Sequence, residues 1–515
     1  MEIDLAQLDS SAATSDLLRA PVCIVGGGIA GLTLAHKLLA LGHQVLLLES
    51  GGHDPETFSP VEQAGHPHPG SSEPRPRALG GTSLTWGGQL LPFPNGNTSW
   101  PISSADLAQF TREAEHLLAV DSLPYDAAAF FDQTRQPAPS LLNQLPQIEA
   151  SLSKFAPFSH RNLAHTLGRK LRAHSKARIV LHATVTELLL APTRDRIEAV
   201  LVRTPSGHIH RVEASQFILA TGTIETVRLL LASCSVAPAG VGNQHDQVGR
   251  NFHDHLTVTA AALREPARTK LLVALRPWIH DGTLHSLKLS ASPELQRQLD
   301  LTPILAHLTI DEPDNSGIGA LRTLLRARQQ SNFASTLRTT LPQLPRALVD
   351  AARLTLSART QHRRYVSPQA SVELRLNAAQ RTHSASRITI SPDLKPILDW
   401  RIAPAELAAL RAFTQHLRTH LNLNGMDWSP ALVTPECNAP LSNLDDARHA
   451  MGGALMGVDP HTSVVDPNLR VHGLRNLFIA SAAVLPDGSP QLPTLPLMAL
   501  TLRLGQHLHS QPRSS

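Results

Sequence analysis

Residues 21–52 read PVCIVGGGIAGLTLAHKLLALGHQVLLLESGG, and this stretch decides the fold. An apolar run at 22–25 has the composition of a buried strand, and the apolar residues of 32–41 recur at helical spacing before Gly42. A second apolar run follows at 45–48. Strand, glycine turn, helix and strand in this order predict a βαβ unit, and therefore an α/β fold with a parallel, Rossmann-like sheet.

The turn between the first strand and the helix fits the spacing G-x-G-x-x-G through Gly26, Gly28 and Gly31. The first glycine permits a tight turn, the second lets the backbone approach a pyrophosphate, and the third lets helix and strand pack closely. Glu49 ends the second strand at about the 20-residue spacing expected of an acid that binds an adenosine ribose. The motif predicts a dinucleotide site without distinguishing FAD from NAD, and an ordinary βαβ unit with an incidental glycine turn is the alternative.

Length and composition limit the other possibilities. A chain of 515 residues is expected to form two or three packed units, and a net charge of +4 gives little reason to expect nucleic-acid binding. Three widely spaced cysteines, Cys23, Cys234 and Cys437, suggest neither a disulfide framework nor a zinc site. Residues 1–20 lack the apolar core of a signal peptide and no apolar run of about 18 residues occurs, so we expect a soluble, cytoplasmic protein.

A glycine-rich stretch, LGGTSLTWGG at 79–88, can press backbone N–H groups against a ligand, although a structural turn would look the same. The stretch resembles the flavin-lining segment of the glucose-methanol-choline family of FAD-dependent oxidoreductases. Some sugar-oxidising relatives attach FAD to a histidine just before the tryptophan, where this chain has Thr85. The resemblance therefore implies non-covalent FAD, lined in this segment by Gly81, Thr82, Ser83, Trp86 and Gly87.

Further segments resemble the same family in order. Residues 178–220 contain short apolar strands, and 221–231 read as a strand, turn and helix similar to a second dinucleotide signature, with Gly222 in the turn and Val185 as a backbone contact to adenine. Residues 248–256, VGRNFHDHL, resemble a box that the family uses structurally where two domains meet. His253, Asp254 and His255 point in different directions and have no matching ligand cluster nearby in sequence, so we expect no metal site.

The C-terminal tail carries the most specific resemblance. Residues 448–460, RHAMGGALMGVDP, the strand 476–480 and a long helix at 493–507 match the family signature in order. This implies a discontinuous FAD-binding domain, formed by 1–256 with a flavin-covering loop at 53–90 and by 444–515, and an α+β substrate-binding or cap domain at 257–443. The resemblance adds four cofactor contacts: Ser481, Ala482, Pro493 and Thr494.

His449 occupies the family's position for a catalytic base. A neutral imidazole there can take the hydroxyl proton of an alcohol while hydride leaves the same carbon for flavin N5. Gap-free alignment places Leu492 where the family normally has a second histidine or asparagine, and Gln491 beside it could substitute only if the turn is reshaped. The resemblance thus implies an FAD-dependent dehydrogenase or oxidase for alcohols with an atypical, more apolar pocket.

Two alternatives remain open from the sequence. One is a flavoprotein of the same fold with non-oxidative or specialised tailoring chemistry, and the other is a flavin-binding protein that docks an acidic partner. Residues 321–365 hold nine arginines and one acid, Asp350, which fits either solvated cap helices or a basic surface for an acidic protein or an anionic membrane. Aromatic residues make up only 4% of the chain, which argues for a small or largely apolar alcohol rather than a free sugar. The electron acceptor is not readable from sequence.

Overall fold

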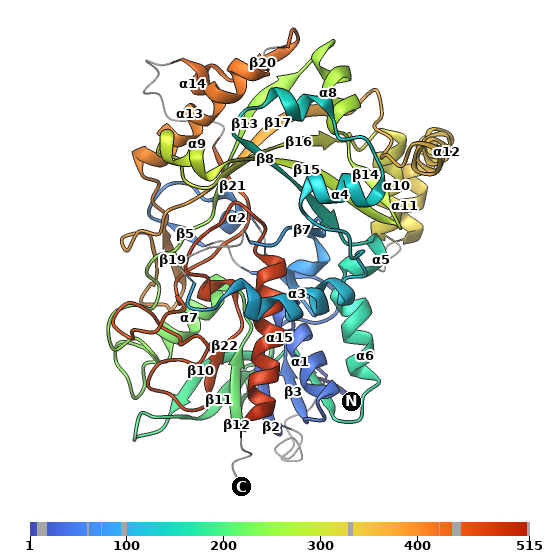
Figure 1. Cartoon of the computed structure of the whole chain (residues 1–515). Coiled ribbons are helices and arrows are strands. Elements are labelled where there is room, and N and C mark those ends of the chain that lie inside the picture. Colours follow the sequence, from blue (N-terminus) through green and yellow to red (C-terminus); the bar gives the residue numbers. More distant parts are fainter. Residues whose placement is uncertain are drawn as a thin grey trace.

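The computed structural model of the chain describes residues 1–7, 18–58, 61–73, 75–93, 100–327, 333–421, 423–434 and 444–511. The molecule has two sheet-centred parts, drawn one below the other in Figure 1. Of the cysteines, Cys23 is a buried free thiol and Cys234 an exposed one, whereas Cys437 and the predicted boundary at 443 lie outside the described residues.

The lower part is built on an eight-stranded sheet in the order β1-β9-β3-β2-β12-β11-β10, with β22 also paired to β12. Its strands are β1 Glu2–Asp4, β2 Arg19–Val25, β3 Val45–Leu48, β9 Ala177–Leu181, β10 Thr184–Leu190, β11 Ile197–Arg203, β12 Ile209–Leu219 and β22 Leu477–Ile479. All four residues of β3 are buried, as expected for a parallel strand covered on both faces. Among the short strands expected within 178–220, β12 is a single strand of 11 residues.

The two ends of the chain meet on this sheet. Helix α1 (Ile29–Ala40) follows the glycine turn, and the C-terminal helix α15 (Thr494–Ser510) packs against both α1 and α3 (Ser104–Leu117). The contact with α1 is close, because a Cβ atom on Gly505 would lie 2.7 Å from the side chain of Lys37. Figure 1 shows the red C-terminal helix beside the blue N-terminal segment. The predicted discontinuous α/β fold is confirmed.

The upper part is built on a nine-stranded sheet in the order β20-β13-β17-β16-β15-β8-β7, with β14 paired to β15 and β21 to β13. Its strands are β7 Gln89–Leu90, β8 Ile148–Phe155, β13 His255–Leu263, β14 Trp278–His280, β15 Thr283–Ala291, β16 Ile304–Asp311, β17 Ser371–Ala379, β20 Met426–Trp428 and β21 Asp445–Asp446. The chain therefore enters this sheet through β7 and β8, well before the predicted domain boundary at 256.

Helices cover one face of the upper sheet. These are α4 (Ala127–Thr134) on β8, α9 (Pro293–Gln298) on β15 and α13 (Pro404–His420) on β17. The short elements elsewhere are β4 Glu56–Thr57, β5 Glu62–Gln63, α2 Pro69–Ser72, β6 Pro76–Arg77, α5 Phe158–Arg161, α6 Arg169–Arg172, α7 Thr223–Ala232, α8 Ala267–Leu275, β18 Arg387–Ile390, β19 Pro396–Asp399 and α14 Pro430–Val433.

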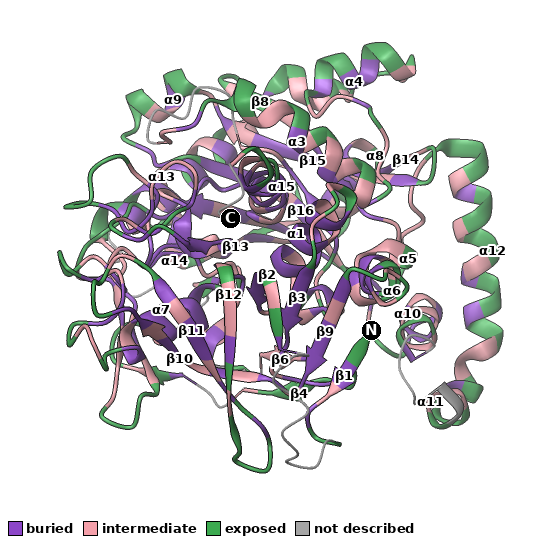
Figure 2. Ribbon diagram, turned by 90° about the horizontal axis from the view of Figure 1, so that it is seen from below, coloured by how far each residue is buried: buried purple, intermediate pink, exposed green. Residues whose placement is uncertain are grey.

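The arginine-rich stretch forms three helices at the edge of the molecule: α10 Gly317–Ala327, α11 Phe333–Thr340 and α12 Leu344–Gln361. Figure 2 shows α12 as an outlying helix with exposed residues along its length. Among the described helices, none combines the length and the apolar character needed to cross a bilayer.

Candidate functional site

The glycine turn is shaped for close backbone approach. Gly26 has a φ of +105°, and a Cβ atom there would lie 2.5 Å from the carbonyl oxygen of Ala220. A Cβ atom on Gly31 would lie only 1.9 Å from the carbonyl oxygen of Gly26. Gly28 begins α1, and no described atom lies within 4 Å of its Cβ position. The helix N-terminus therefore opens onto free space that can admit a phosphate.

A second helix N-terminus lies on the neighbouring strand. Gly222, with a φ of +74°, precedes α7, and its Cβ position is likewise free of described atoms within 4 Å. β12, which leads into this turn, pairs directly with β2, and the Ala220 N–H donates to the carbonyl of Val25 over 2.7 Å. The two glycine turns thus lie at the same edge of the sheet. Val185 is buried on β10, opposite Val202.

Glu49 is buried at the end of β3 and is tied to the glycine turn. One carboxylate oxygen accepts the N–H of Gly27 over 2.8 Å and the other accepts the N–H of Gly51 over 2.9 Å. These bonds fix the acid beside the turn, which is the place that a ribose-binding carboxylate requires.

The predicted flavin-lining loop packs directly on the glycine turn. The N–H of Gly80 donates to the carbonyl of Gly27 over 2.8 Å, and a Cβ atom on Gly81 would lie 3.0 Å from Cα of Gly28. Ser83 is buried; its hydroxyl donates to the Gly80 carbonyl and accepts the Leu163 N–H. Trp86 donates its indole N–H to the carbonyl of Arg161 over 2.8 Å, whereas three residues of the loop are exposed, namely Thr82, Thr85 and Gly87.

These residues fit a flavin dinucleotide. Two uncapped helix N-termini supply N–H groups for the pyrophosphate, glycines leave the room that it needs, and a buried acid stands at the end of β3. Gly26, Gly28, Gly31, Glu49, Gly81 and Gly222 would hold the cofactor.

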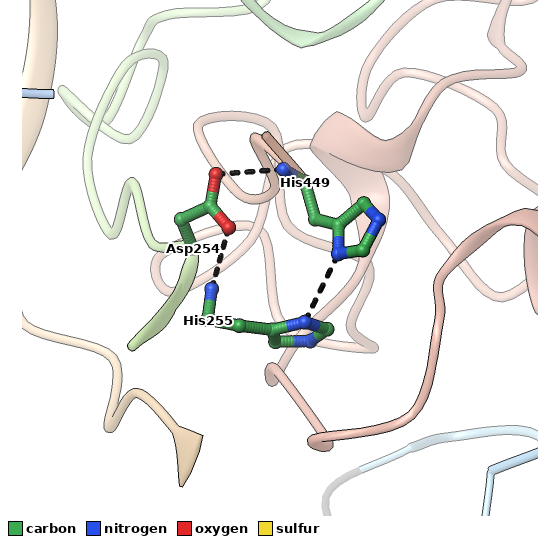
Figure 3. Close-up of side chains that lie close together, drawn as sticks. All are labelled: Asp254, His255 and His449. Carbon is green, nitrogen blue, oxygen red and sulfur yellow. Dashed lines mark hydrogen bonds between the residues drawn. The ribbon is translucent and has the colours of Figure 1, made fainter. Parts of the chain in front are cut away.

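His449 lies where the box at 248–256 meets the tail. Its backbone N–H donates to Oδ2 of Asp254 over 2.8 Å, and its Nδ1 lies 3.1 Å from Nδ1 of His255. Figure 3 shows the other ring nitrogen of His449 directed away from both partners. One imidazole nitrogen is thereby held by the protein, and the other can reach a substrate.

Asp254 organises this cluster. It is fully buried, and its Oδ1 accepts the N–H groups of His255 and Ala447 over 2.6 Å and 3.3 Å. Its Oδ2 accepts the N–H of His449 and lies 3.2 Å from Nε2 of His68. Burial raises the pKa of Asp254, but the hydrogen bond with His68 and the nearby histidines bring it below its ordinary value. A charged carboxylate therefore fixes the backbone of His449.

The fold gives the box at 248–256 ligand-type neighbours that its surroundings in the sequence lack. The fold brings Asp254 and His255 to His449, and it also brings His68 and Asp446 to Asp254. Sequence spacing could not show this because His449 lies 194 residues beyond His255. His255 and Asp254 are functional candidates that the sequence reading took as purely structural.

Both facing histidines are neutral near pH 7. Burial lowers the pKa of His449, against the opposing effect of Asp254. Burial and then His449 lower the pKa of His255 to about 3. With both rings neutral, one Nδ1 must carry the proton and the other must accept it.

The loop before α15 holds the remaining predicted residues. Leu492 is half-buried directly before Pro493, which caps α15, and Thr494 begins that helix. Gln491 is buried and its amide oxygen accepts a hydrogen bond from the Ser489 hydroxyl, so its carbonyl is directed to its own loop. Ser481 accepts the N–H of Ala483, and Ala482 accepts the N–H of Gly452.

Comparisons with known proteins match both ends of the chain. A family model described as FAD dependent oxidoreductase matches residues 21–240, and one described as GMC oxidoreductase matches residues 382–501. Relatives include the fructose dehydrogenase large subunit of Gluconobacter japonicus, 26% identical over 66% of this chain and 54% of its own length. Another is a glucose dehydrogenase (FAD, quinone) of Drosophila melanogaster, 23% identical over 90% of this chain and 83% of its own length. The chain thus spans about half the length of the first relative.

The fold is also found among solved structures. Pyridoxine 4-oxidase from Mesorbium loti superposes with a TM-score of 0.61 and 16% identity, covering 96% of this chain and all of that one. At this identity the likeness shows the shared fold.

Proposed function

Because the chain belongs to the glucose-methanol-choline family of FAD-dependent oxidoreductases, we propose that it oxidises a CH–OH group of a small-molecule substrate with His449 as the base. The observation that supports this most directly is the setting of His449. Its backbone is held by Asp254, its Nδ1 by His255, and its other ring nitrogen is directed away from both.

The protein's part in the reaction follows from the two histidines. If Nδ1 of His449 carries the proton and donates to Nδ1 of His255, then Nε2 of His449 has a free lone pair. Nε2 then takes the hydroxyl proton of the substrate. The bound FAD supplies the two-electron acceptor for the hydrogen that leaves carbon.

Leu492 makes the reacting end of the pocket unusual. A leucine cannot hydrogen-bond the substrate oxygen, and the amide oxygen of Gln491 already accepts from Ser489. In our proposal this loop therefore gives the substrate oxygen no second polar contact. Loss of one such contact typically costs about 10²-fold to 10³-fold in rate, which weakens catalysis without abolishing it. His255, the first residue of β13, supports the base His449 and does not replace this contact to the substrate oxygen.

We propose that the FAD is bound without a covalent bond, because Thr85 stands where covalent relatives carry a histidine. Acid precipitation should release the flavin into the supernatant. A yellow pellet after precipitation would contradict this part of the proposal.

The experiment that tests the function is anaerobic addition of alcohols to the flavin-loaded protein. We expect bleaching of the oxidised flavin, faster in Leu492→Asn for simple alcohols and strongly slowed in His449→Ala. A broad panel that leaves the flavin oxidised would instead favour non-oxidative or tailoring chemistry on the same fold. Unchanged bleaching in His449→Ala would show that another group is the base.

A second proposal concerns α12, whose outward face supports contact with an anionic lipid surface. Leu348 is 70% exposed, Val349 51% and Leu356 64%, while the buried residues of the helix lie on its opposite side. Exposed Arg346 and Arg353 flank this apolar strip. Exposed leucines beside arginines are the composition of a helix that lies in a membrane interface.

A further inference from the structure

Three basic residues form a row across neighbouring strands of the upper sheet: Lys288 on β15, His307 on β16 and Arg375 on β17. His307 pairs directly with Arg375 across the antiparallel strands. Lys288 lies one position beyond the cross-strand pair of Leu289 and Ala306, which places it opposite His307. We call these three residues the Lys288 row.

The row faces the proposed active site. His285 contacts Phe130 of α4, and Leu287 and Leu289 share its face of β15, so this is the face that helices cover. Lys288 alternates with them and points to the opposite face. On that face Ser153 accepts a hydrogen bond from Gln89, which directly follows the flavin-lining loop.

The same face reaches His255 at its other edge. On β13, His255, Thr257 and Thr259 alternate onto one face, and Thr259 is the cross-strand partner of Arg375. The hydroxyl of Thr257 also donates to the amide oxygen of Asn377. The Lys288 row and the His255–His449 pair therefore belong to one continuous wall.

Lys288 is buried without a counter-charge. Lys288 is 4% exposed, and among the described residues it has no carboxylate partner and donates no hydrogen bond. Burial lowers the pKa of Lys288 to about 7. Only Arg375 of the row has an acid: its Nε lies 3.1 Å from Glu373, which also accepts from Thr259. Nδ1 of His307 is buried and has no partner among the described residues.

We propose that the Lys288 row binds a carboxylate of the substrate, so that the alcohol proposed above is a hydroxy acid. The inference rests on the proposed function. A buried ammonium without a partner is costly, and a carboxylate between Lys288 and Arg375 would supply charge-assisted hydrogen bonds to both. This proposal differs from the expectation of a small or largely apolar alcohol, which was drawn from the low aromatic content of the chain.

The register gives the length of the substrate. Arg375 pairs with Thr259, which lies four residues after His255 on β13. At ~3.3 Å per residue along a strand and ~4.8 Å between strands, the backbone positions of His255 and Arg375 are about 14 Å apart. After the reach of the side chains, the hydroxyl and the carboxylate are several carbon atoms apart.

The test compares ω-hydroxy acids of four to eight carbons with the uncharged diols of the same length, measured as anaerobic flavin reduction. We expect the best hydroxy acid to exceed its diol in kcat/KM by about 10-fold to 100-fold. Lys288→Met should remove this advantage mainly through KM, so that the acid and the diol of the same length become similar substrates. It should not lower the protein's thermal stability, because it removes a buried ammonium that has no partner. Lys395→Met, at an exposed lysine, is the matched control and should change nothing.

Binding of octanoate, which carries no hydroxyl, gives a readout that needs no turnover. We expect it to perturb the flavin spectrum with a Kd that Lys288→Met and Arg375→Met each raise by about tenfold or more. The carboxylate site would be overturned if Lys288→Met lowered kcat/KM equally for acids and diols. It would also be overturned if neither variant weakened octanoate binding. If no alcohol reduces the flavin but octanoate binding still depends on Lys288, the proposed oxidation fails and the carboxylate site stands.

Discussion

Nδ1 of His449 lies 3.1 Å from Nδ1 of His255, and the backbone N–H groups of both residues donate to the carboxylate of Asp254. One acid thus fixes two histidines that come from distant parts of the chain. Because both rings are neutral, a single proton lies between the two Nδ1 atoms. If His255 accepts this proton's hydrogen bond, His449 is protonated on Nδ1 and its Nε2 keeps a lone pair for the substrate.

Replacing His255 should therefore slow the reaction without removing the base. We expect His255→Leu to lower the rate of flavin reduction by about 10²-fold, because His449 loses the acceptor that holds its tautomer. His255→Asn, whose amide oxygen can accept the same hydrogen bond, should recover part of the rate. Flavin content should be unchanged, and the surface variant His245→Ala serves as control. Equal rates for His255→Leu and His255→Asn would refute a role through Nδ1.

The pH profile of flavin reduction should report His449. A base works in its neutral form, and burial lowers the pKa of His449, so the neutral form persists to lower pH than in a free histidine. The rate should therefore fall only as pH drops below about 6.5, the ordinary pKa of histidine. This fall in rate at low pH should be absent in His449→Gln, whose residual rate is about 10²-fold to 10⁴-fold lower. A midpoint above 6.5 in the wild type would contradict the burial effect.

Two glycine substitutions should separate cofactor binding from folding. Gly28→Ala meets no described protein atom within 4 Å and has a φ of −79°, so the protein should fold normally, yet the new methyl group enters the phosphate space. FAD affinity should fall about tenfold or more, ~1.4 kcal/mol. Gly31→Ala would place Cβ 1.9 Å from a carbonyl oxygen, and it should lower the free energy of unfolding by about 1–3 kcal/mol or more. Thermal unfolding and flavin titration of both variants measure this; equal flavin affinity in Gly28→Ala and wild type would argue against the assigned cradle.

The sequence predicted the parts of the fold that are encoded locally. The second strand of the βαβ unit is at 45–48 as expected, because four consecutive apolar residues between a glycine turn and an acid have few alternatives in an α/β protein. Strand β8 had no such signal. Its Ser151 and Ser153 lie on the polar face of the upper sheet, and its buried Lys154 pairs with Glu115, so no simple apolar alternation marks it.

The site was only half predictable for a related reason. His449 stood out through its surrounding motif, whereas His255 became a neighbour of His449 only through the placement of β13 against the tail. The Lys288 row depends on strand order and register, which connect β15, β16 and β17 across loops and helices of varied length. Composition alone suggested a small or largely apolar alcohol, and composition carries no information on which polar residues gather on one face of a sheet.

The exposed face of α12 gives a last prediction. We expect the protein to sediment with vesicles rich in anionic lipid at low salt and to be released as salt rises. The arginines are attracted to the lipid charge, which salt screens, and the exposed leucines insert into the interface. Changing Leu348 and Leu356 to glutamate should abolish vesicle binding while leaving flavin reduction intact. Changing the exposed Leu394 to glutamate, in a turn between β18 and β19, is the matched control and should bind as wild type does. Vesicle binding that is unchanged by the leucine substitutions but lost with the arginines would contradict insertion of the leucines and leave only electrostatic attraction to the lipid, and no vesicle binding would leave α12 as an ordinary solvated cap helix.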